Sequence, residues 1–323
     1  MAENANRTAL VTGANSGLGF EASAQLAEQG YGKLLITTRT IEKGQAAKDA
    51  LVARTGRDVF ETVVLDNDRL QSVTQAAAGL SESGYKIDFV LLNAGVAPAK
   101  NLVMSADGLE ATYSSTLIGH HLLTMLLLEN GGLSNNARIV MAGSEAARGD
   151  VPTFHPLDVN AFADEHYAGD LEAAIEAQIR MQPPAKYVPS NTYATTKMFA
   201  AWWAAELATF LPEGMTVNTV SPGSTPGTNA ARNAPFFMRA FMIPMFKLMP
   251  GMSHSVAEGA HRYLEVAEYG DDVTGKFFAS PPKKMIGPLE EMRMDHLTNP
   301  EGQRALWNVT TKVAGGVGYP AKK

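Results

Sequence analysis

The sequence predicts an α/β fold in which a parallel sheet is covered by helices on both faces. Short apolar runs rich in β-branched residues alternate with longer segments whose apolar residues recur at helical spacing. The apolar runs are nearly continuous, which is typical of strands buried on both faces. We therefore expect one doubly wound domain over residues 1–323, with a seven-stranded parallel sheet in the order 3-2-1-4-5-6-7.

Five of the seven expected strands are followed by residues suited to the ligand-binding edge of such a sheet. A glycine-rich turn follows the first strand, Asp66 ends the third, Asn93 closes the fourth, Ser144 follows the fifth and a Pro-Gly pair follows the sixth. The expected strands are residues 8–12, 33–37, 59–65, 87–92, 138–142, 216–220 and 276–279. The expected helices are residues 19–28, 42–53, 70–80, 108–128, 193–210 and 256–267.

Two segments interrupt the alternation. Residues 145–189 are acidic, with eight Asp or Glu against three Lys or Arg, and contain a helical pattern over residues 165–181. Residues 224–254 are rich in Gly, Pro, Met and Phe. Both segments follow strands, so both are expected at the ligand-binding edge. We interpret them as an insertion and a substrate lid, with surface decoration as the alternative.

The composition excludes several classes of function. The chain has 323 residues, 45% hydrophobic and 19% charged, with a net charge of -6 and no basic run, which argues against a nucleic-acid partner. It has no cysteine, which excludes disulfides and fits a reducing compartment. The first residues are polar, and no apolar run approaches the ~20 residues that span a bilayer. We expect a cytoplasmic protein without stable membrane insertion.

The turn after the first strand is TGANSGLG, with glycines at positions 13, 17 and 19. Residues without a Cβ let the backbone approach a phosphate group and let the next helix begin close by. The free N–H groups and the dipole of that helix attract a pyrophosphate. A glycine-rich turn alone is weak evidence, but its place between the first strand and the first helix favours dinucleotide binding.

The end of the second strand discriminates between nicotinamide cofactors. Enzymes that hold the ribose 2′-hydroxyl of NAD usually carry a carboxylate about 20 residues after the glycines. This chain has Thr38 and Arg39 there, and no Asp or Glu in residues 34–40. A guanidinium pairs with a 2′-phosphate through charge-assisted hydrogen bonds, and Thr38 adds a hydroxyl donor. The residues therefore predict that the cofactor is NADP(H). The alternative is that Arg39 is simply a solvated arginine at the end of a strand.

In the stretch NTYATTKMFAAWW, Tyr193 precedes Lys197 by four residues, which places both on one face of a helix. The pair has two interpretations. One is a buried hydroxyl beside a lysine whose ammonium reaches solvent. The other is a phenol made acidic by the ammonium: lowering its pKa from ~10 to ~7 takes about 4 kcal/mol, which one cation in a partly dry site can supply.

Taken in order, several motifs resemble those of the short-chain dehydrogenase/reductase family. They are TGANSGLG, Asp66, Asn93-Ala94-Gly95, Ser144, Tyr193-x-x-x-Lys197 and VNTVSPG. The stretches DGLEATYSSTLIGHHLLT and SVAEGAHRYL are most similar to the retinol dehydrogenase and carbonyl reductase branches. The resemblance covers nearly the whole chain. It implies a Rossmann-like fold that binds NADP(H) and interconverts a small hydrophobic ketone or aldehyde and its alcohol.

The resemblance also implies a role for each motif residue. Ser144 holds the substrate oxygen, Tyr193 transfers the proton, and Lys197 binds the nicotinamide ribose and lowers the pKa of Tyr193. Thr116 stands where the family usually has an asparagine that organises a relay water, so proton exchange is expected to differ. The implied cofactor-binding residues are Gly13, Asn15, Ser16, Gly17, Leu18, Gly19, Thr38, Arg39, Asp66, Asn67, Asn93, Ala94, Gly95, Tyr193, Lys197, Pro222, Gly223 and either Thr225 or Thr228.

No metal site is expected. His120 and His121 are adjacent, so on a helix they point to different faces and cannot form an i, i+4 metal pair. We expect one of them in the core and the other at the surface.

The lid and the insertion bear on the substrate and the oligomeric state. Residues 235–250 have eleven Phe, Met, Ile, Leu or Ala among sixteen residues, which suits an adaptable apolar pocket. Core packing and a helix on a membrane surface are the alternatives. Ser144 and Tyr193 are 49 positions apart. Carbonyl reductases resemble the chain in this long insertion, which in them covers a tetramer surface, so we expect a monomer, with a homodimer as the alternative.

Two other functions stay open. One is the NADPH-dependent reduction of a conjugated C=C bond, as in the protochlorophyllide reductases, which also use a Tyr and Lys pair. The other is a non-catalytic, NADP-binding regulatory protein, for which Thr116 is the only support.

Overall fold

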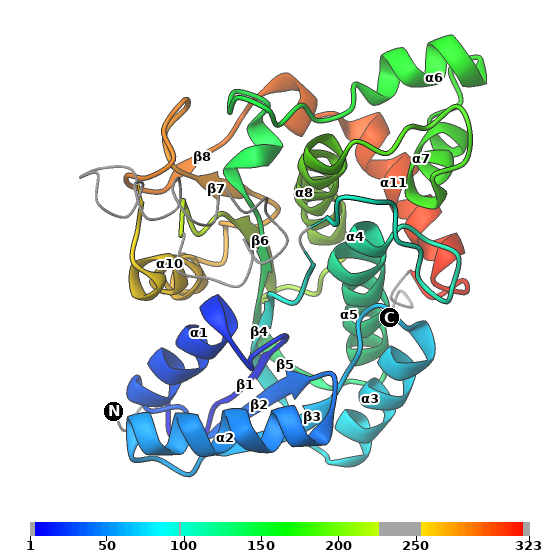
Figure 1. Ribbon diagram of the computed structural model, residues 1–323. Coiled ribbons are helices and arrows are strands. Elements are labelled where there is room, and N and C mark those ends of the chain that lie inside the picture. The colour runs from blue at the N-terminus through cyan, green and yellow to red at the C-terminus, as the bar shows by residue number, and fades with distance from the viewer. Residues whose placement is uncertain (1–3, 97, 226–252, 319–323) are drawn as a thin grey trace.

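The computed structural model describes residues 4–96, 98–225 and 253–318, built around one eight-stranded sheet (Figure 1). The strand order is β3-β2-β1-β4-β5-β6-β7-β8, and β1 to β7 are parallel. The predicted order of the first seven strands is confirmed. The eighth strand, Glu290–Glu291, pairs antiparallel with β7 and is too short to leave a periodic pattern in the sequence.

The strands agree with the expected ones except at their ends. Their bounds are β1 Thr8–Val11, β2 Lys33–Thr38, β3 Phe60–Val64, β4 Ile87–Leu92, β5 Leu133–Ala142, β6 Thr216–Val220 and β7 Phe277–Ala279. The largest difference is in β5, which begins at Leu133, opposite Ile87, before a shift of register. Residues 134–136 are polar, which hides this part of the strand from the sequence pattern.

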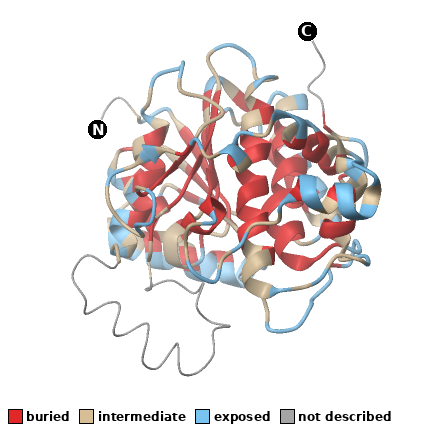
Figure 2. Ribbon diagram, turned by 90° about the horizontal axis from the view of Figure 1, so that it is seen from above, coloured by how far each residue is buried: buried red, intermediate tan, exposed pale blue. Residues whose placement is uncertain are grey.

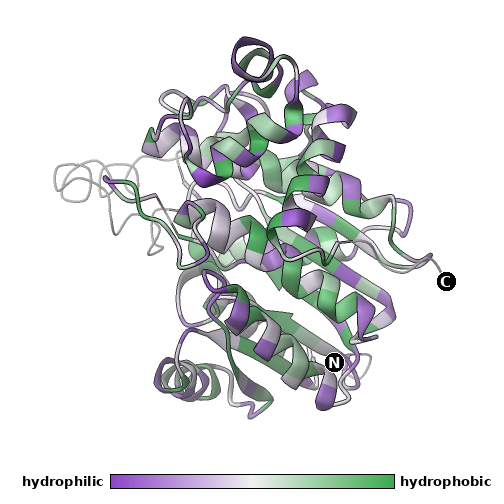
Figure 3. Ribbon diagram, turned by 90° about the vertical axis from the view of Figure 1, so that its right-hand side faces the viewer, coloured by the Kyte–Doolittle hydropathy of each residue, from purple (hydrophilic) through white to green (hydrophobic). Residues whose placement is uncertain are grey.

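Helices cover both faces of the sheet, and each face has its own apolar core. On one face lie α1 (Gly17–Glu28), α2 (Ile41–Thr55) and α10 (Val256–Ala267); on the other lie α3 (Leu70–Glu82), α5 (Gly119–Glu129) and α8 (Pro189–Ala208). Figure 2 shows the buried residues on the strands and on the helix faces that meet them. Figure 3 shows the hydrophilic residues toward the outside of the same helices.

The helix expected over residues 108–128 has three parts. It begins with α4 (Ala111–Tyr113), because the buried carboxylate of Glu110 accepts the N–H groups of Thr112 at 2.9 Å and Tyr113 at 3.2 Å. A π-helical turn, Ser114–Ile118, then leads into α5. Such turns are rare and often lie at functional sites. Thr116 is in this turn.

The insertion contains two helices where the sequence predicts one over residues 165–181. They are α6 (Val159–Tyr167) and α7 (Leu171–Arg180). The chain breaks between them at Ala168 and Gly169, whose φ angles are 51° and 84°. The carboxylate of Asp170 then accepts the N–H of Ala173 at 3.0 Å and begins α7. Part of the acidity of this segment therefore serves to cap helices.

A final helix, α11 (Pro300–Val313), is missing from the predicted elements and packs on α8 (Figure 1). Gly302 leaves room for Trp202, since a Cβ there would lie 2.6 Å from the Trp202 ring. Trp307 stacks on Trp203 with ring centres 6.4 Å apart. Because α8 is covered in this way, apolar residues occur on all its faces. Without a polar face, the sequence of α8 does not indicate which side packs on which neighbour.

The prediction that one of the two adjacent histidines lies at the surface is wrong, because both are buried. His121 accepts the indole N–H of Trp203 at 3.0 Å and donates to the carbonyl of Val317 at 2.8 Å. Burial lowers the pKa of His121 to about 4, so the ring is neutral. Its partners are distant in sequence, which is why adjacency alone did not place it.

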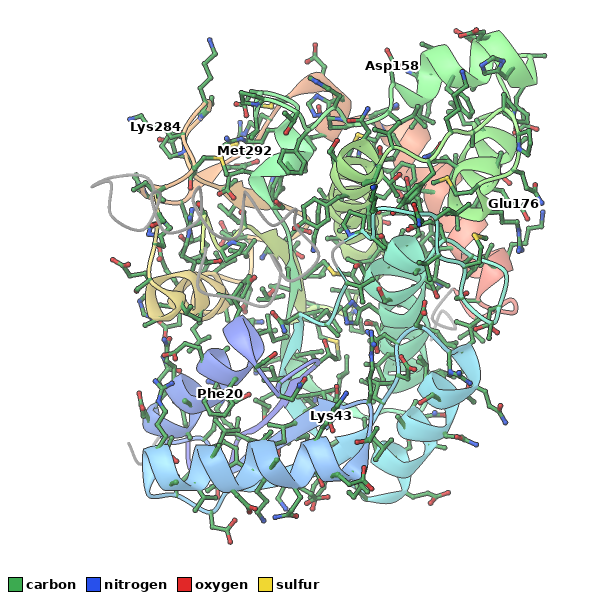
Figure 4. All side chains as sticks on the ribbon, in the orientation of Figure 1. Phe20, Lys43, Asp158, Glu176, Lys284 and Met292 are labelled. Carbon is green, nitrogen blue, oxygen red and sulfur yellow. The ribbon has the colours of Figure 1, made fainter. Side chains whose placement is uncertain are left out.

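The outer side of the insertion is tied to α11 by charge. Glu176 on α7 accepts a hydrogen bond from Lys312 on α11 at 2.6 Å (Figure 4).

Within the described residues, no helix is long and apolar enough to cross a membrane.

Candidate active site

Three of the predicted site residues meet beyond the carboxyl end of β5. Ser144 follows that strand, and its hydroxyl is near enough to the phenol of Tyr193 to lower the pKa of that phenol. Tyr193 and Lys197 lie one turn apart on α8, with the Lys197 ammonium 5.7 Å from the centre of the Tyr193 ring. The fold thus closes the long sequence gap created by the insertion. The arrangement offers the Tyr193 phenol as a proton donor, the Ser144 hydroxyl near it, and the Lys197 ammonium as a cation one helical turn away.

Lys197 is almost completely buried. Its ammonium donates a hydrogen bond to the carbonyl of Ala142, the last residue of β5, at 2.7 Å. Burial lowers its pKa to about 8. An ammonium has three N–H donors, and Ala142 accepts one of them, so the side chain can still bind ligand hydroxyls.

The phenol of Tyr193 is partly buried and has an apolar neighbour, because the Phe154 ring packs on it with centres 6.0 Å apart. Burial raises the pKa of Tyr193, the hydrogen bond with Ser144 lowers it, and the nearby charge of Glu145 raises it. The net direction is upward, so in the protein alone Tyr193 stays protonated at neutral pH. The family-based expectation of a lowered pKa is therefore not met without a ligand.

Thr116 lies at the back of this site. A Cβ added to Gly95 would lie 2.8 Å from the Thr116 hydroxyl, so the two residues are in contact. The carbonyl of Thr116 accepts the Nδ1 hydrogen of His120 at 2.8 Å. Burial, with a smaller effect from the charge of Lys197, lowers the pKa of His120 to about 3. His120 is therefore neutral, with its second ring nitrogen left as an acceptor.

Thr12 connects the histidine to the end of β4 and is a residue that sequence reasoning missed. Its hydroxyl donates to Nε2 of His120 at 2.9 Å. The same oxygen accepts the N–H groups of Asn93 at 2.8 Å and Ala94 at 2.9 Å. The sequence did offer one sign that Thr12 belongs to the site, because this residue directly precedes the first glycine of the glycine-rich turn.

The glycine-rich turn fits a dinucleotide phosphate. Gly13 and Gly17 have φ angles of 66° and 60°, which only glycine adopts readily. A Cβ at Gly19 would lie 2.6 Å from the side-chain nitrogen of Asn93, so the turn packs closely on β4. The side chain of Ser16 makes no hydrogen bond to the first turn of α1, which leaves that helix end for an anion. The turn also contains Asn15, which is exposed, and Leu18, which contacts Gly259.

Beyond the ends of β2 and β3, Arg39 and Asp66 are brought together. The Arg39 guanidinium is half-exposed and lies 3.5 Å from a carboxylate oxygen of Asp66. Arg69 approaches the other oxygen of Asp66 at 3.7 Å. The hydroxyl of Thr38 donates to the carbonyl of Thr40 at 2.8 Å, so the donor that the sequence predicts for a phosphate is engaged within the protein.

The remaining predicted residues take different positions. Asn67 donates to the carbonyl of Ser115 at 3.2 Å and thereby supports the π-helical turn. Gly223 follows β6 with a φ of 76°, directly after Pro222. Thr225 lies against α10, since a Cβ at Gly259 would be 2.5 Å from its methyl group. Thr228 and most of the predicted lid, residues 226–252, lie outside the described residues.

Comparisons with known proteins agree with this geometry. The family model described as short chain dehydrogenase matches residues 7–156. Retinol dehydrogenase 13 of Homo sapiens is 28% identical over 314 residues, covering 96% of this chain and 85% of that protein. Its counterpart in Mus musculus is 27% identical over 96% of this chain and 84% of that protein. A crystal structure of an uncharacterized protein from Mycobacterium paratuberculosis shares the fold, with a TM-score of 0.68, 23% identity and coverage of 96% and 93%.

The burial of Lys197 predicts a pH dependence of stability. Its pKa is about 8 in the folded protein and ~10.4 in the unfolded chain, so between these values the unfolded chain binds more protons and stability rises with pH. The charged lysine therefore destabilises the fold below pH ~8. We expect Lys197→Met to raise the free energy of unfolding at pH 7 by up to about 3 kcal/mol, and the gain to shrink toward pH 10. Urea denaturation at several pH values measures this.

The matched control is Lys186→Met, because Lys186 is exposed and should give no pH-dependent gain. A Lys197→Met effect of equal size at pH 7 and pH 10 would contradict the argument.

Proposed function

We propose that the chain is a short-chain dehydrogenase/reductase that acts as an NADP(H)-dependent oxidoreductase, because the short chain dehydrogenase model matches residues 7–156 and the chain is similar to retinol dehydrogenases. Its substrates are hydrophobic ketones or aldehydes and the matching alcohols. The observation that carries the proposal is the position of buried Lys197, whose ammonium lies 5.7 Å from the centre of the Tyr193 ring, with Ser144 near the Tyr193 phenol. When bound, the nicotinamide cofactor supplies or accepts the hydride.

The proposed roles follow from the contacts. Tyr193 is the acid in reduction, since a phenol with a raised pKa holds its proton until the substrate oxygen accepts it. Ser144, whose hydroxyl lies near the phenol of Tyr193, holds that oxygen. Lys197 binds the ribose hydroxyls with its remaining donors and stabilises the phenolate that the transfer leaves. Thr116 stays in the proposed relay through its hydroxyl, because its carbonyl already accepts from His120.

A hydrophobic substrate is supported from two sides. The named relatives are retinol dehydrogenases, and retinol is a largely apolar alcohol. Phe154 packs on Tyr193 and supplies an apolar wall next to the proton donor. The insertion, of which Phe154 is part, is thus proposed to line the substrate entrance.

The core test replaces Tyr193 with phenylalanine. We expect NADPH oxidation with a panel of hydrophobic ketones and aldehydes to fall by about 10²–10⁴ in kcat, because the proton donor is lost while the ring remains. Tyr85→Phe is the control, since its hydroxyl bonds Glu61 at the surface. Retained activity in Tyr193→Phe would remove the acid from its role.

The same panel includes enals and reads out the other candidate functions. A saturated aldehyde as the product would assign the enzyme to C=C reduction. NADPH binding without turnover of any compound would assign it to the non-catalytic class that Thr116 suggests.

The preference for NADP(H) is proposed from Arg39. Its guanidinium is half-exposed at the end of β2, and the ion pair with Asp66 holds it there at 3.5 Å. A 2′-phosphate would gain charge-assisted hydrogen bonds from it, whereas a free 2′-hydroxyl would not.

We expect Arg39→Asp to reverse the ratio of NADPH to NADH affinities, measured by titration of nicotinamide fluorescence. Arg69→Asp is the matched control, because Arg69 also pairs with Asp66 but follows β3 rather than β2. A ratio that is unchanged in Arg39→Asp, or equally changed in both variants, would reject this assignment.

A monomeric, single-domain protein is also proposed, with a cytoplasmic location. Trp202 and Trp203 on α8 lie under α11, and α11 in turn contacts α7 of the insertion. These elements occupy the helical face that would otherwise be open to another subunit. Light scattering should therefore give a mass near 34.5 kDa. A tetramer would overturn the proposal.

A further inference from the structure

Glu145, the residue after Ser144, is buried in a polar cluster that the proposed reaction does not use. Its carboxylate accepts hydrogen bonds from the hydroxyl of Ser221 and, at 3.0 Å, from the hydroxyl of Ser280. The backbone N–H of Ser280 also donates to it, at 3.3 Å. Ser221 follows β6 and Ser280 follows β7. One carboxylate thus joins the ends of three neighbouring strands.

The link through Ser221 reaches the turn at Pro222 and Gly223, two residues that the family resemblance implies in cofactor binding. The hydroxyl of Ser221 accepts the N–H of Gly223 at 3.3 Å while it donates to Glu145. Gly223 has a positive φ, so the direction of this turn depends on the bonds that hold it.

The opposite side of the turn is held by Arg262 of α10. Its guanidinium lies 4.0 Å from Glu145 and donates to Ser280 at 3.1 Å and to Nε2 of His254 at 3.1 Å. A Cβ on Gly223 would lie 2.7 Å from the Arg262 guanidinium and 2.3 Å from the His254 ring. The turn therefore runs between Glu145 and the Arg262–His254 pair.

From this geometry we propose that Glu145 is a positioning residue that couples the Ser144 end of β5 to the nicotinamide-binding turn at Ser221–Gly223. It places the serine hydroxyl and the nicotinamide ring in register. The proposal rests on the proposed function. It adds to that function that the Ser221–Gly223 turn binds the nicotinamide end of the cofactor.

The ionisable groups around Glu145 determine how its charge changes the pH dependence of the reaction. Arg262 and His254 face it from α10 and the segment before α10, and Arg148 lies one turn further along its own 3-10 helix. Arg148 is paired with Asp150 at 3.0 Å, so Arg262 is the cation that balances Glu145. On the other side lie Tyr193 and Tyr263, and the pKa of both phenols is raised in part by the charge of Glu145.

The test uses the full-length protein and two ligands. NADPH contains the nicotinamide, whereas adenosine 2′,5′-diphosphate occupies only the adenine end. We expect Glu145→Gln to weaken NADPH binding about tenfold, with the affinity for adenosine 2′,5′-diphosphate unchanged. In reduction, kcat/KM falls at high pH as the phenol of Tyr193 loses its proton. This fall should begin about one pH unit lower in Glu145→Gln, because the phenol loses a neighbouring negative charge.

A second variant separates position from charge. Ser221→Ala removes the link to the turn but keeps the carboxylate, so NADPH binding should weaken while the pH profile stays in place. Glu206→Gln is the control: Glu206 is another buried glutamate, 3.8 Å from Arg304, at the far end of α8, and should leave both readouts unchanged. Near-UV circular dichroism confirms that each variant is folded.

Failure of this inference is distinguishable from failure of the proposed function. If Glu145→Gln and Ser221→Ala weaken both ligands equally, or neither, the positioning role is overturned even in an active enzyme. If the natural protein binds NADPH but reduces nothing, the proposed function fails while the two-ligand comparison still decides the role of Glu145. Should NADH bind more tightly than NADPH, the pair NADH and ADP gives the same comparison.

Discussion

Burying the ammonium of Lys197 beside the phenol of Tyr193 is the constraint on which the rest of the structure depends. A buried cation costs several kcal/mol unless the surroundings satisfy it. The carbonyl of Ala142 accepts one N–H group, and the lowered pKa shows that the cost is met only in part. The protein must therefore hold α8 in place by other means, and it does so with apolar packing on every side of that helix.

That packing comes from segments far apart in the chain. The sheet supports α8 from one side, α11 covers it with Gly302 and Trp307, and the insertion adds α7 beyond. A large-to-small change in such a core typically costs 2–5 kcal/mol, so the apolar shell can outweigh one strained charge.

The polar groups around the candidate site form two separate networks. On one side, Thr12, His120 and the carbonyl of Thr116 connect the glycine-rich turn to the π-helical turn. On the other, Glu145 connects Ser144 to the turn after β6. Both networks are buried, where hydrogen bonds are stronger and missing partners are costly. They hold the ends of five strands at fixed distances around the space where a cofactor would lie.

The sequence by itself determined the sheet, the order of its first seven strands and the position of the glycine-rich turn. Strand periodicity and glycine spacing are local properties, so a single chain reveals them. It also placed Ser144 at the ligand-binding edge, because parallel strands end together, whereas the place of Tyr193 and Lys197 beside it was implied by the family resemblance. Only the tertiary structure decided which groups surround them. Glu145 and Arg262, His120 and Thr12, and Trp203 and Trp307 are pairs whose members are distant in the sequence. Burial, and with it the pKa of Lys197 and of both histidines, follows from contacts of this kind rather than from any local pattern.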